Sequence, residues 1–446
     1  MSRFLTGLLK GREVTETAKT ENNAMHITLL HYTAPPIVGG VESVMAHHAR
    51  ELMDSGHSVT ILAGRADDYA MLARANVIVL PELDSQHPDN LYIAQALEHG
   101  MVPREFEAFQ KRIEQELDPL CADSDAVIAH NVFNYHFNLP LTAALHSLIK
   151  QGRLTRMIAW CHDISRYVNP ASGAEQRFGF PWDLLRTYRP EVTYVAVSPQ
   201  RQRTLAEVLE CSRKLIHVVP NGVDVQTLLG LDDLTWRLVE EFDLLGADLI
   251  ALMPIRITRA KNIEYALRVI AALKASGLLP KLIVTGPPDP HSSDREAYRS
   301  ELLALRRELK LDQEVVFIYE GTPYLPGPFT VDARTVAGLF RVCDLVLMPS
   351  RREGFGMPIL ESGLVGKPVF CTAVPVLEQV GAEFVYQIGA DEPPNHLATR
   401  ILAWTQQNMA HRLRWRVRKE YTWSAIFQQA IQPLIASVIP ASEQKL

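Results

Sequence analysis

Glycines and glutamates at one predicted strand-to-helix corner are the residues best suited to chemistry. The stretch 349–362, PSRREGFGMPILES, follows the apolar run Leu345–Met348, which predicts a buried parallel strand. Pro358 stands where a helix would begin, because the first helical turn does not need an N–H there. Gly354 and Gly356 would let a ligand approach the backbone, and the free amides of the helix start attract anions. We therefore expect a phosphate at this corner.

Two carboxylates flank the same glycines. Glu353 lies in the loop and Glu361 lies in the first turns of the predicted helix. Carboxylates accept hydrogens from hydroxyl groups, which sugars supply. A phosphate site between two carboxylates favours a sugar nucleotide as the ligand. An ordinary turn with two solvated glutamates is the alternative for this stretch alone.

The spacing of these residues resembles a known donor-site motif. Glu followed eight residues later by Glu, across Gly-Phe-Gly-x-Pro, is similar to the motif of the retaining glycosyltransferases of family 4, which have the GT-B fold. The resemblance implies that a hexose moves from a nucleotide-diphosphate sugar to a hydroxyl acceptor with retention of anomeric configuration. It implies that Glu353 is catalytic and holds the donor sugar. Gly354, Phe355, Gly356 and Glu361 would bind the donor, with Glu361 on the ribose.

A pair of cations follows another predicted strand. Arg256 comes at the carboxyl end of the run Leu249–Ile255, and Lys261 lies five residues later, before an amphipathic helix. A guanidinium can form two parallel hydrogen bonds with phosphate oxygens, and an ammonium is a compact charge. Arg-x4-Lys matches the family's pair, which implies that both residues are catalytic and stabilise the departing nucleoside diphosphate. Two solvated loop cations are the alternative.

The amino-terminal half also has notable residues at strand ends. Gly39 and Gly40 follow the first predicted strand, at the edge where parallel sheets bind ligands, and the family places a Gly-Gly loop near the phosphates and the acceptor. His162 follows another predicted strand. The resemblance implies that His162 contacts the transferred sugar, and Asp163 could orient its imidazole. A turn and a histidine bonded to local backbone are the alternatives.

Strand and helix patterns alternate along most of the chain, which predicts an α/β fold. The resemblance implies the GT-B plan of two facing Rossmann-like domains with parallel sheets and a central cleft. We expect a disordered tail over 1–24, an acceptor-side domain over 25–224, a linker over 225–247 and a nucleotide-sugar-binding domain over 248–423. The last helix, about 424–446, resembles the helix that crosses back onto the first domain in this fold.

Composition excludes several other classes of protein. A net charge of −6 with interspersed signs argues against a nucleic-acid partner, and we expect the basic run Arg412–Lys419 to be a solvated helix face. The chain has no run of eighteen apolar residues and no convincing signal peptide, so we expect a cytoplasmic protein with no transmembrane segment. Five scattered cysteines fit reduced core thiols. A short apolar face in residues 1–11 leaves peripheral membrane contact open.

We expect no metal and no other cofactor. Asp123-Ser124-Asp125 matches the metal-binding motif of a different glycosyltransferase fold, but it precedes its predicted strand and so lies away from the ligand edge. The charge on the leaving group would then be met by Arg256, Lys261 and the helix amides after Gly354.

The sequence leaves the substrates open. A carbohydrate, a lipid-linked compound or a small polar molecule could be the acceptor, and the donor base is not indicated, because the loop after Glu320 departs from the family pattern. Two other functions share this architecture, a sugar-nucleotide epimerase and a glycogen-type phosphorylase. A non-catalytic nucleotide-sugar-binding protein is a further alternative.

Overall fold

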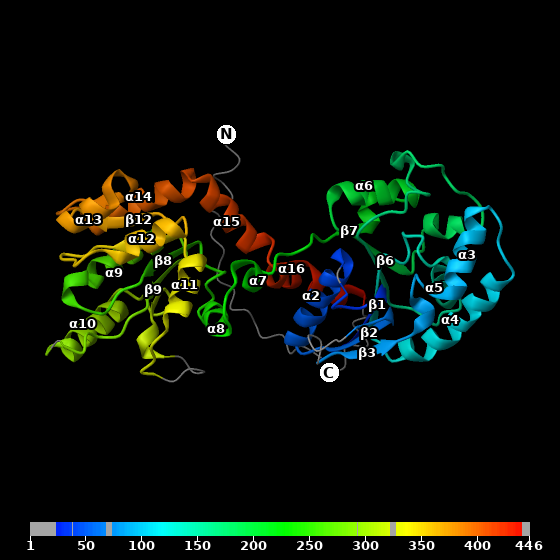
Figure 1. The fold of residues 1–446 in the computed structure, drawn as a ribbon, viewed down its shortest axis with the longest axis horizontal. Coiled ribbons are helices and arrows are strands. Elements are labelled where there is room, and N and C mark those ends of the chain that lie inside the picture. Colours follow the sequence, from blue (N-terminus) through cyan, green and yellow to red (C-terminus); the bar gives the residue numbers. More distant parts are fainter. Residues whose placement is uncertain (1–23, 38, 68–73, 292, 322–326, 439–446) are drawn as a thin grey trace. The chain divides into compact units, whose positions relative to one another are not determined.

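The computed structural model describes residues 24–37, 39–67, 74–291, 293–321 and 327–438. Nearly all of the expected tail, 1–24, and the end of the expected last helix therefore lie outside the described residues. The described chain divides into two compact units, which Figure 1 shows as separate groups of helices and strands. The N-terminal unit holds residues up to Gly222 and those from Trp423 onwards, and the C-terminal unit is Val223–Thr422.

A fully parallel sheet forms the centre of the N-terminal unit. In spatial order its described strands are β3 (Asn76–Val79), β2 (Ser58–Arg65), β1 (His26–Thr33), β4 (Ala126–His130), β5 (Met157–Cys161), β6 (Val192–Ala196) and β7 (Ile216–Val218). The strand order reverses between β1 and β4, which is where such sheets bind ligands at their carboxyl ends.

Helices cover both faces of this sheet, because alternate residues of its buried strands point to opposite sides. The helices of this unit are α2 (Gly40–Asp54), α3 (Pro88–Glu98), α4 (Glu105–Ala122), α5 (Leu139–Lys150), α6 (Pro199–Val208), α16 (Trp423–Ile426) and α17 (Gln432–Val438). Helices α3 and α4 and strand β3 lie in a stretch for which we predicted no element.

The last helical segment completes the second face of the N-terminal sheet. Helices α16 and α17, joined by a π-helical turn over Phe427–Ile431, pack with α2 against Ile128 and Ile158 of the sheet. Figure 1 shows α16 beside α2, and Trp423 stacks on His47 of α2 with ring centroids 4.9 Å apart. The predicted return of the C-terminal helix to the first domain is confirmed.

A second parallel sheet forms the centre of the C-terminal unit. Its described strands are, in spatial order, β10 (Val315–Phe317), β9 (Pro280–Val284), β8 (Leu249–Met253), β11 (Leu345–Met348), β12 (Val369–Thr372) and β13 (Tyr386–Ile388). Two parallel-sheet α/β units are the architecture that the sequence predicts. Their expected facing arrangement with a central cleft stays a prediction.

The C-terminal sheet is also covered on both faces. The helices of this unit are α7 (Val225–Leu229), α8 (Asp233–Glu241), α9 (Ile263–Ala275), α10 (Arg295–Glu308), α11 (Ala333–Val342), α12 (Met357–Leu364), α13 (Pro375–Gly381), α14 (Pro394–Gln407) and α15 (Met409–Glu420).

The stretch 225–247 differs from the expected linker. It forms α7 and α8, and Leu238 and Val239 of α8 are buried in one core of the C-terminal unit. Asp232 caps α8 by accepting a hydrogen bond from Thr235 N at 2.7 Å. These residues are therefore part of the C-terminal unit, because an amphipathic helix supplies one layer of its core.

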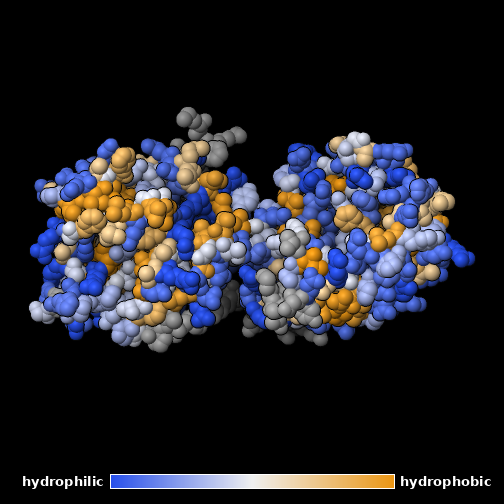
Figure 2. Space-filling model, viewed as in Figure 1, coloured by the Kyte–Doolittle hydropathy of each residue, from blue (hydrophilic) through white to orange (hydrophobic). Residues whose placement is uncertain are grey.

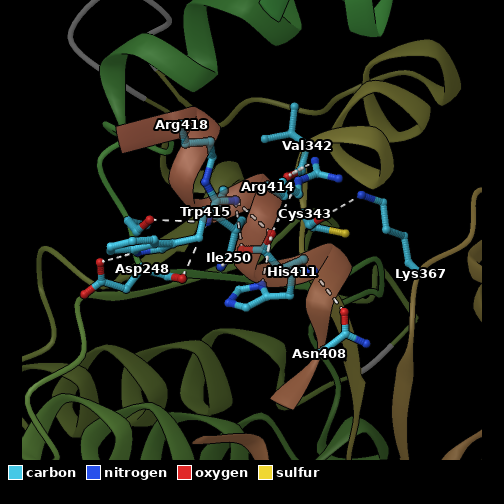
Figure 3. A network of polar contacts seen from close by, with 12 residues as sticks. Asp248, Ile250, Val342, Cys343, Lys367, Asn408, His411, Arg414, Trp415 and Arg418 are labelled. Carbon is cyan, nitrogen blue, oxygen red and sulfur yellow. Dashed lines mark hydrogen bonds and ion pairs between the residues drawn. The ribbon is translucent and has the colours of Figure 1, made fainter. Parts of the chain in front are cut away.

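The basic run at the end of α15 also differs from the prediction of a solvated face. Arg414 and Arg418, which Figure 3 labels within a network of polar contacts, both pair with the buried carboxylate of Asp344. Arg418 donates to both oxygens of Asp344, at 2.8 and 2.9 Å, and Ile250 N donates to one of them at 2.9 Å. The run thus anchors α15 to the amino ends of β8 and β11.

Within the described residues, no helix combines the length and apolarity needed to cross a membrane.

Candidate active site

The glycine corner after β11 begins helix α12 as the sequence predicts. Gly356 is the residue before the helix and has φ +86°, a left-handed conformation that favours glycine. A Cβ at Gly356 would also lie 2.6 Å from Leu377 Cδ2, whereas a Cβ at Gly354 would meet nothing within 4 Å. Pro358 has no N–H and Ile359 N donates to Gly356 O at 2.9 Å, so of the first three residues of α12 only Met357 offers an N–H to an anion.

An ion pair joins the two predicted motifs of the C-terminal unit. Lys261 Nζ lies 2.6 Å from Glu353 Oε1, and their side chains are only 20% and 7% exposed. Ser350 Oγ donates to the same oxygen at 2.8 Å. Residues that are 92 positions apart in the sequence therefore meet at the carboxyl ends of β8 and β11.

Further contacts hold the two loops together. Arg351 N donates to Ala260 O at 2.8 Å, and the Arg351 guanidinium reaches Glu264 Oε1 at 2.9 Å. On the other side of the β8–α9 loop, Ile257 N donates to Pro287 O at 3.0 Å. The Lys261–Glu353 pair is thus fixed from several directions, as preorganised electrostatic sites require.

The remaining predicted donor residues are accessible. Arg256 is exposed and its guanidinium has no partner among the described residues. Glu361 is exposed on α12, and Phe355 is 56% exposed. In the left-hand group of Figure 2, hydrophobic residues reach the surface around the α12–α14 region that Figure 1 labels; exposed apolar side chains here include Phe355, Met357, Leu360 and Leu364.

In the N-terminal unit, the Gly-Gly loop positions a carboxylate. Glu42, in the first turn of α2, accepts a hydrogen bond from Thr33 Oγ1 at 2.5 Å. A Cβ at Gly39 would lie 2.0 Å from Glu42 Oε2, so Gly39 makes room for this side chain. At Gly40 a Cβ would meet nothing. The sequence prediction for this loop named only its two glycines and assigned no role to Glu42.

His162 lies just after β5 and contacts another histidine. Its Nε2 is 2.9 Å from Nδ1 of His130, the last residue of β4, and the two rings stack with centroids 5.3 Å apart. Burial and, to a smaller extent, the neighbouring His31 lower the pKa of His162 to about 3. His162 is therefore neutral at ordinary pH and acts as a hydrogen-bonding group.

Asp163 does not hold this ring in the described structure. Its Oδ1 accepts from Ile164 N at 2.8 Å and pairs with Arg201 at 3.1 Å. The backbone at His162 is instead held by Asn131, whose Oδ1 accepts from His162 N at 2.8 Å. Asp163 therefore does not orient His162 as predicted, and Asn131, in the loop after β4, holds the backbone of His162.

The sequence prediction missed the histidines that surround His162. His31 lies near the end of β1, His130 is the last residue of β4, and His48 of α2 lies against His130 with ring centroids 5.3 Å apart. The signal was present, because both His31 and His130 follow apolar strand residues, as His162 does. The strand-end argument was applied to only one of three similar positions.

The Asp123-Ser124-Asp125 stretch has a role within the fold. Asp125 Oδ2 accepts from His26 N at 2.8 Å, and Ser124 Oγ lies 2.6 Å from Thr28 Oγ1. These bonds tie the start of β4 to the start of β1. The stretch therefore lies at the amino edge of the sheet, opposite the edge that carries His162.

Comparison with known proteins assigns the chain to a family. The family model described as Glycosyltransferase Family 4 matches residues 38–227, and the model described as Glycosyl transferases group 1 matches residues 237–420. Between them the two models span both units of the described fold. The chain belongs to the family 4, or group 1, glycosyltransferases and is a transferase.

Relatives agree with this assignment at modest identity. A mannosylglucosylglycerate synthase of Thermotoga maritima is 26% identical over 371 residues, which are 77% of this chain and 80% of the relative. An uncharacterised glycosyltransferase of Methanocaldococcus jannaschii is 22% identical over 427 residues, or 91% and 97%. A crystal structure of a glycosyltransferase from Rickettsia africae is 16% identical, with 94% of this chain and 100% of that one covered and a TM-score of 0.37.

Proposed function

We propose that this glycosyltransferase moves a hexose from a nucleotide-diphosphate sugar to a hydroxyl acceptor, with retention of anomeric configuration and without a metal ion. The observation that carries the proposal is the Lys261–Glu353 pair, 2.6 Å apart with side chains 20% and 7% exposed, in which Glu353 lies four residues before α12 begins at Met357. A fixed cation, a carboxylate and a helix start together suit a phosphate that bears a sugar.

Different residues of the C-terminal unit would bind different parts of the donor. Arg256 is exposed and can form paired hydrogen bonds with phosphate oxygens. Lys261 has three donors, so it can bind phosphate while it stays bonded to Glu353. Glu353 would accept a hydroxyl hydrogen of the hexose, and the exposed Glu361 would accept those of the ribose. In the N-terminal unit, neutral His162 would bind a hydroxyl of the hexose.

In the proposed reaction the bond between the anomeric carbon and the phosphate oxygen breaks, and its electron pair leaves with the nucleoside diphosphate. The acceptor oxygen then bonds to the anomeric carbon on the same face of the sugar, through an oxocarbenium-like state. Its proton moves to the departing phosphate oxygen. Fixed positive charge near that oxygen stabilises the leaving group, because it costs no reorganisation during the reaction.

Metal independence is supported by where the charges lie. Arg256, Lys261 and the N–H of Met357 at the start of α12 are all at the carboxyl edge of the C-terminal sheet, so they can neutralise a diphosphate there. The residues that matched a metal motif, Ser124 and Asp125, are bonded to β1 at the opposite edge of the N-terminal sheet.

The acceptor belongs to one of three classes, a carbohydrate, a lipid-linked compound or a small polar molecule. The name of the Thermotoga maritima relative, a mannosylglucosylglycerate synthase, makes small polar glycosides a sensible first choice for a screen. A cytoplasmic location is part of the proposal, and five free cysteines, four of them buried, suit a reducing compartment.

A thermal-shift screen against nucleoside diphosphates and their sugars tests donor binding, because a ligand that binds only the native state raises the melting temperature. One diphosphate should stabilise the wild type clearly, and Arg256→Ala should lose most of that shift while its own melting temperature stays unchanged. NMR of the anomeric proton in the product then tests retention. No shift with any diphosphate, or a product of inverted configuration, would contradict the proposal.

A further inference from the structure

Two hydrogen bonds connect three histidines near the carboxyl ends of adjacent strands in the N-terminal unit, one to the backbone of His130 and one to its ring. The strands β1, β4 and β5 are neighbours; His31 lies two residues before the end of β1, His130 is the last residue of β4 and His162 follows β5. His31 Nδ1 is 2.7 Å from His130 O, and His130 Nδ1 is 2.9 Å from His162 Nε2. The direction in which each bond donates decides what His162 can offer a ligand.

The first bond has only one possible direction. A carbonyl oxygen accepts and cannot donate, so Nδ1 of His31 must carry the hydrogen. Burial lowers the pKa of His31, which leaves the ring neutral with a single N–H. His31 therefore donates from Nδ1 to the backbone of His130.

The direction of the second bond follows from the surroundings of Nε2, the other nitrogen of the His130 ring. Its Nε2 is sealed from solvent and has no partner among the described residues. If the hydrogen were on Nε2, a buried N–H would be left unpaired, which costs about 1–3 kcal/mol and is rare in native proteins. Trp160 Nε1, which can only donate, is also sealed and unpartnered, and its ring lies 6.0 Å from that of His130. A hydrogen on Nε2 of His130 would be a second unpaired donor beside Trp160 Nε1. Nε2 of His130 is therefore better left without a hydrogen.

We infer that His130 is a positioning residue: it donates from Nδ1 to Nε2 of His162, so His162 presents Nδ1–H, a neutral donor, to an oxygen of the donor sugar. The inference rests on the proposed function for the role of His162. It also means that His162 cannot remove a proton from the acceptor through Nε2, because that lone pair is already bonded to His130.

The backbone at His162 is fixed by Asn131, the residue that follows His130. Asn131 has φ 57°, a left-handed conformation that is uncommon for residues other than glycine. In this conformation its Oδ1 accepts from both His162 N, at 2.8 Å, and Asp163 N, at 3.2 Å. Ring and backbone of His162 are therefore both positioned by residues 130 and 131.

NMR of the full chain labelled with ¹⁵N-histidine tests the tautomers directly, with His130→Leu and His162→Ala used for assignment. We expect both His130 and His162 to carry hydrogen on Nδ1 and a bare Nε2 at neutral pH. A hydrogen on Nε2 of His162 in the wild type would overturn the inference, whatever the activity.

Binding measurements on variants test the consequence. His130→Leu should weaken binding of the preferred nucleotide sugar about tenfold, equivalent to about 1.4 kcal/mol, and leave binding of the free nucleoside diphosphate unchanged. His130→Asn places an amide N–H near the position of Nδ1 and should restore most of the loss, whereas His130→Gln should not. The melting temperatures of the three His130 variants show whether any of them has lost its fold.

His48→Phe is the matched control. His48 lies in the same cluster, but neither of its ring nitrogens has a hydrogen-bond partner among the described residues, so this variant should bind nucleotide sugar as the wild type does. Equal losses in His130→Leu and His130→Asn would overturn the inference. If His162→Ala bound nucleotide sugar normally while the tautomers were as expected, the sugar contact in the proposed function would fail and the tautomer assignment would stand.

Discussion

The carboxyl edges of the two sheets differ in how they hold polar groups. In the N-terminal unit the edge is lined by neutral histidines, and burial keeps the pKa of His162 at about 3. In the C-terminal unit the edge carries charges, with the Lys261–Glu353 pair fixed between loops and Arg256 exposed. A sugar hydroxyl needs hydrogen bonds of defined direction, whereas a diphosphate needs positive charge. The histidine edge therefore suits hydroxyl groups, and the charged edge suits phosphate.

The largest expected effect is at the charged edge. Glu353→Gln keeps the size of the side chain but removes the charge that fixes Lys261, so we expect transfer to fall by about 10²-fold or more. Release of nucleoside diphosphate in the presence of acceptor measures this. Glu361→Gln, on exposed α12, should mainly raise the KM for the donor. Turnover near the wild-type level in Glu353→Gln would rule out its assigned role.

The buried charge network at the amino edge of the C-terminal sheet should dominate stability. Asp344→Asn would leave Arg418 buried without its counter-ion, which costs about 3–5 kcal/mol in the free energy of unfolding. Urea unfolding measures this, and activity per folded molecule should be unchanged, because the network is opposite the donor edge. Asp248→Asn, which removes a partly exposed carboxylate from the same network, is the control and should cost clearly less. If both variants lost the same free energy of unfolding, the assigned role of Asp344 would be refuted.

The two units should respond to acid at different pH. Burial lowers the pKa of His48 to about 3, from 6.5, so its unfolded form binds a proton more readily and stability falls as pH drops below 6.5. Burial alone would raise the pKa of Asp344, but Arg418, His411 and Arg414 lower it to about 2 from 3.8. Its stabilising contribution is therefore present above 3.8 and is lost only as pH falls toward about 2.

His48→Phe tests the first part of this comparison. It removes one of the groups that titrate on unfolding, so the fall in melting temperature between about pH 7.5 and about pH 5.5 should be smaller than in the wild type, by the equivalent of about 1 kcal/mol. Calorimetry at both pH values measures it. An identical fall in both proteins would show that His48 is not held neutral by the fold.

A change of similar size separates the two glycines of the predicted donor corner. Gly356→Ala must adopt φ +86° and press on Leu377, which should cost about 1–2 kcal/mol of stability. Gly354→Ala meets no neighbour, so its melting temperature should not change, whereas its affinity for nucleotide sugar should fall. Thermal unfolding measures the stability of both variants, and titration measures their affinity for nucleotide sugar. A destabilised Gly354→Ala with normal affinity would reverse the assignment.

Much of this organisation could be predicted, because the signals were local. Apolar runs of four to six residues predicted most strands at the centres of both sheets, and glycine and proline marked the start of α12. The donor corner and the Arg-x4-Lys pair are continuous in sequence, so each could be located. Their contact with each other depended only on the rule that parallel strands end at one edge.

The predictions that failed concerned residues whose contact partners lie far away in the sequence. The basic run on α15 was interpreted as solvated, but His411, Arg414, Trp415 and Arg418 recur at the spacing of one helix face, and that face meets Asp344, 74 residues before Arg418. The helix α8 was assigned to a linker because its short apolar face has meaning only against the core it covers. The partner of His162 was missed for the same reason, since His130 lies 32 residues earlier.

The return of the last helix has a consequence for the synthesis of this protein. One hydrophobic face of the N-terminal sheet is covered in part by Ile426, Phe427, Ile431 and Leu434, which follow Gly222 by about two hundred residues. At about 5–20 residues per second, the ribosome needs roughly 10–40 s to make that stretch. During this time the first sheet exists with part of its core still exposed to water. The first unit to be translated is therefore the last to be completed, and a chain cut short before Trp423 would keep that apolar face uncovered.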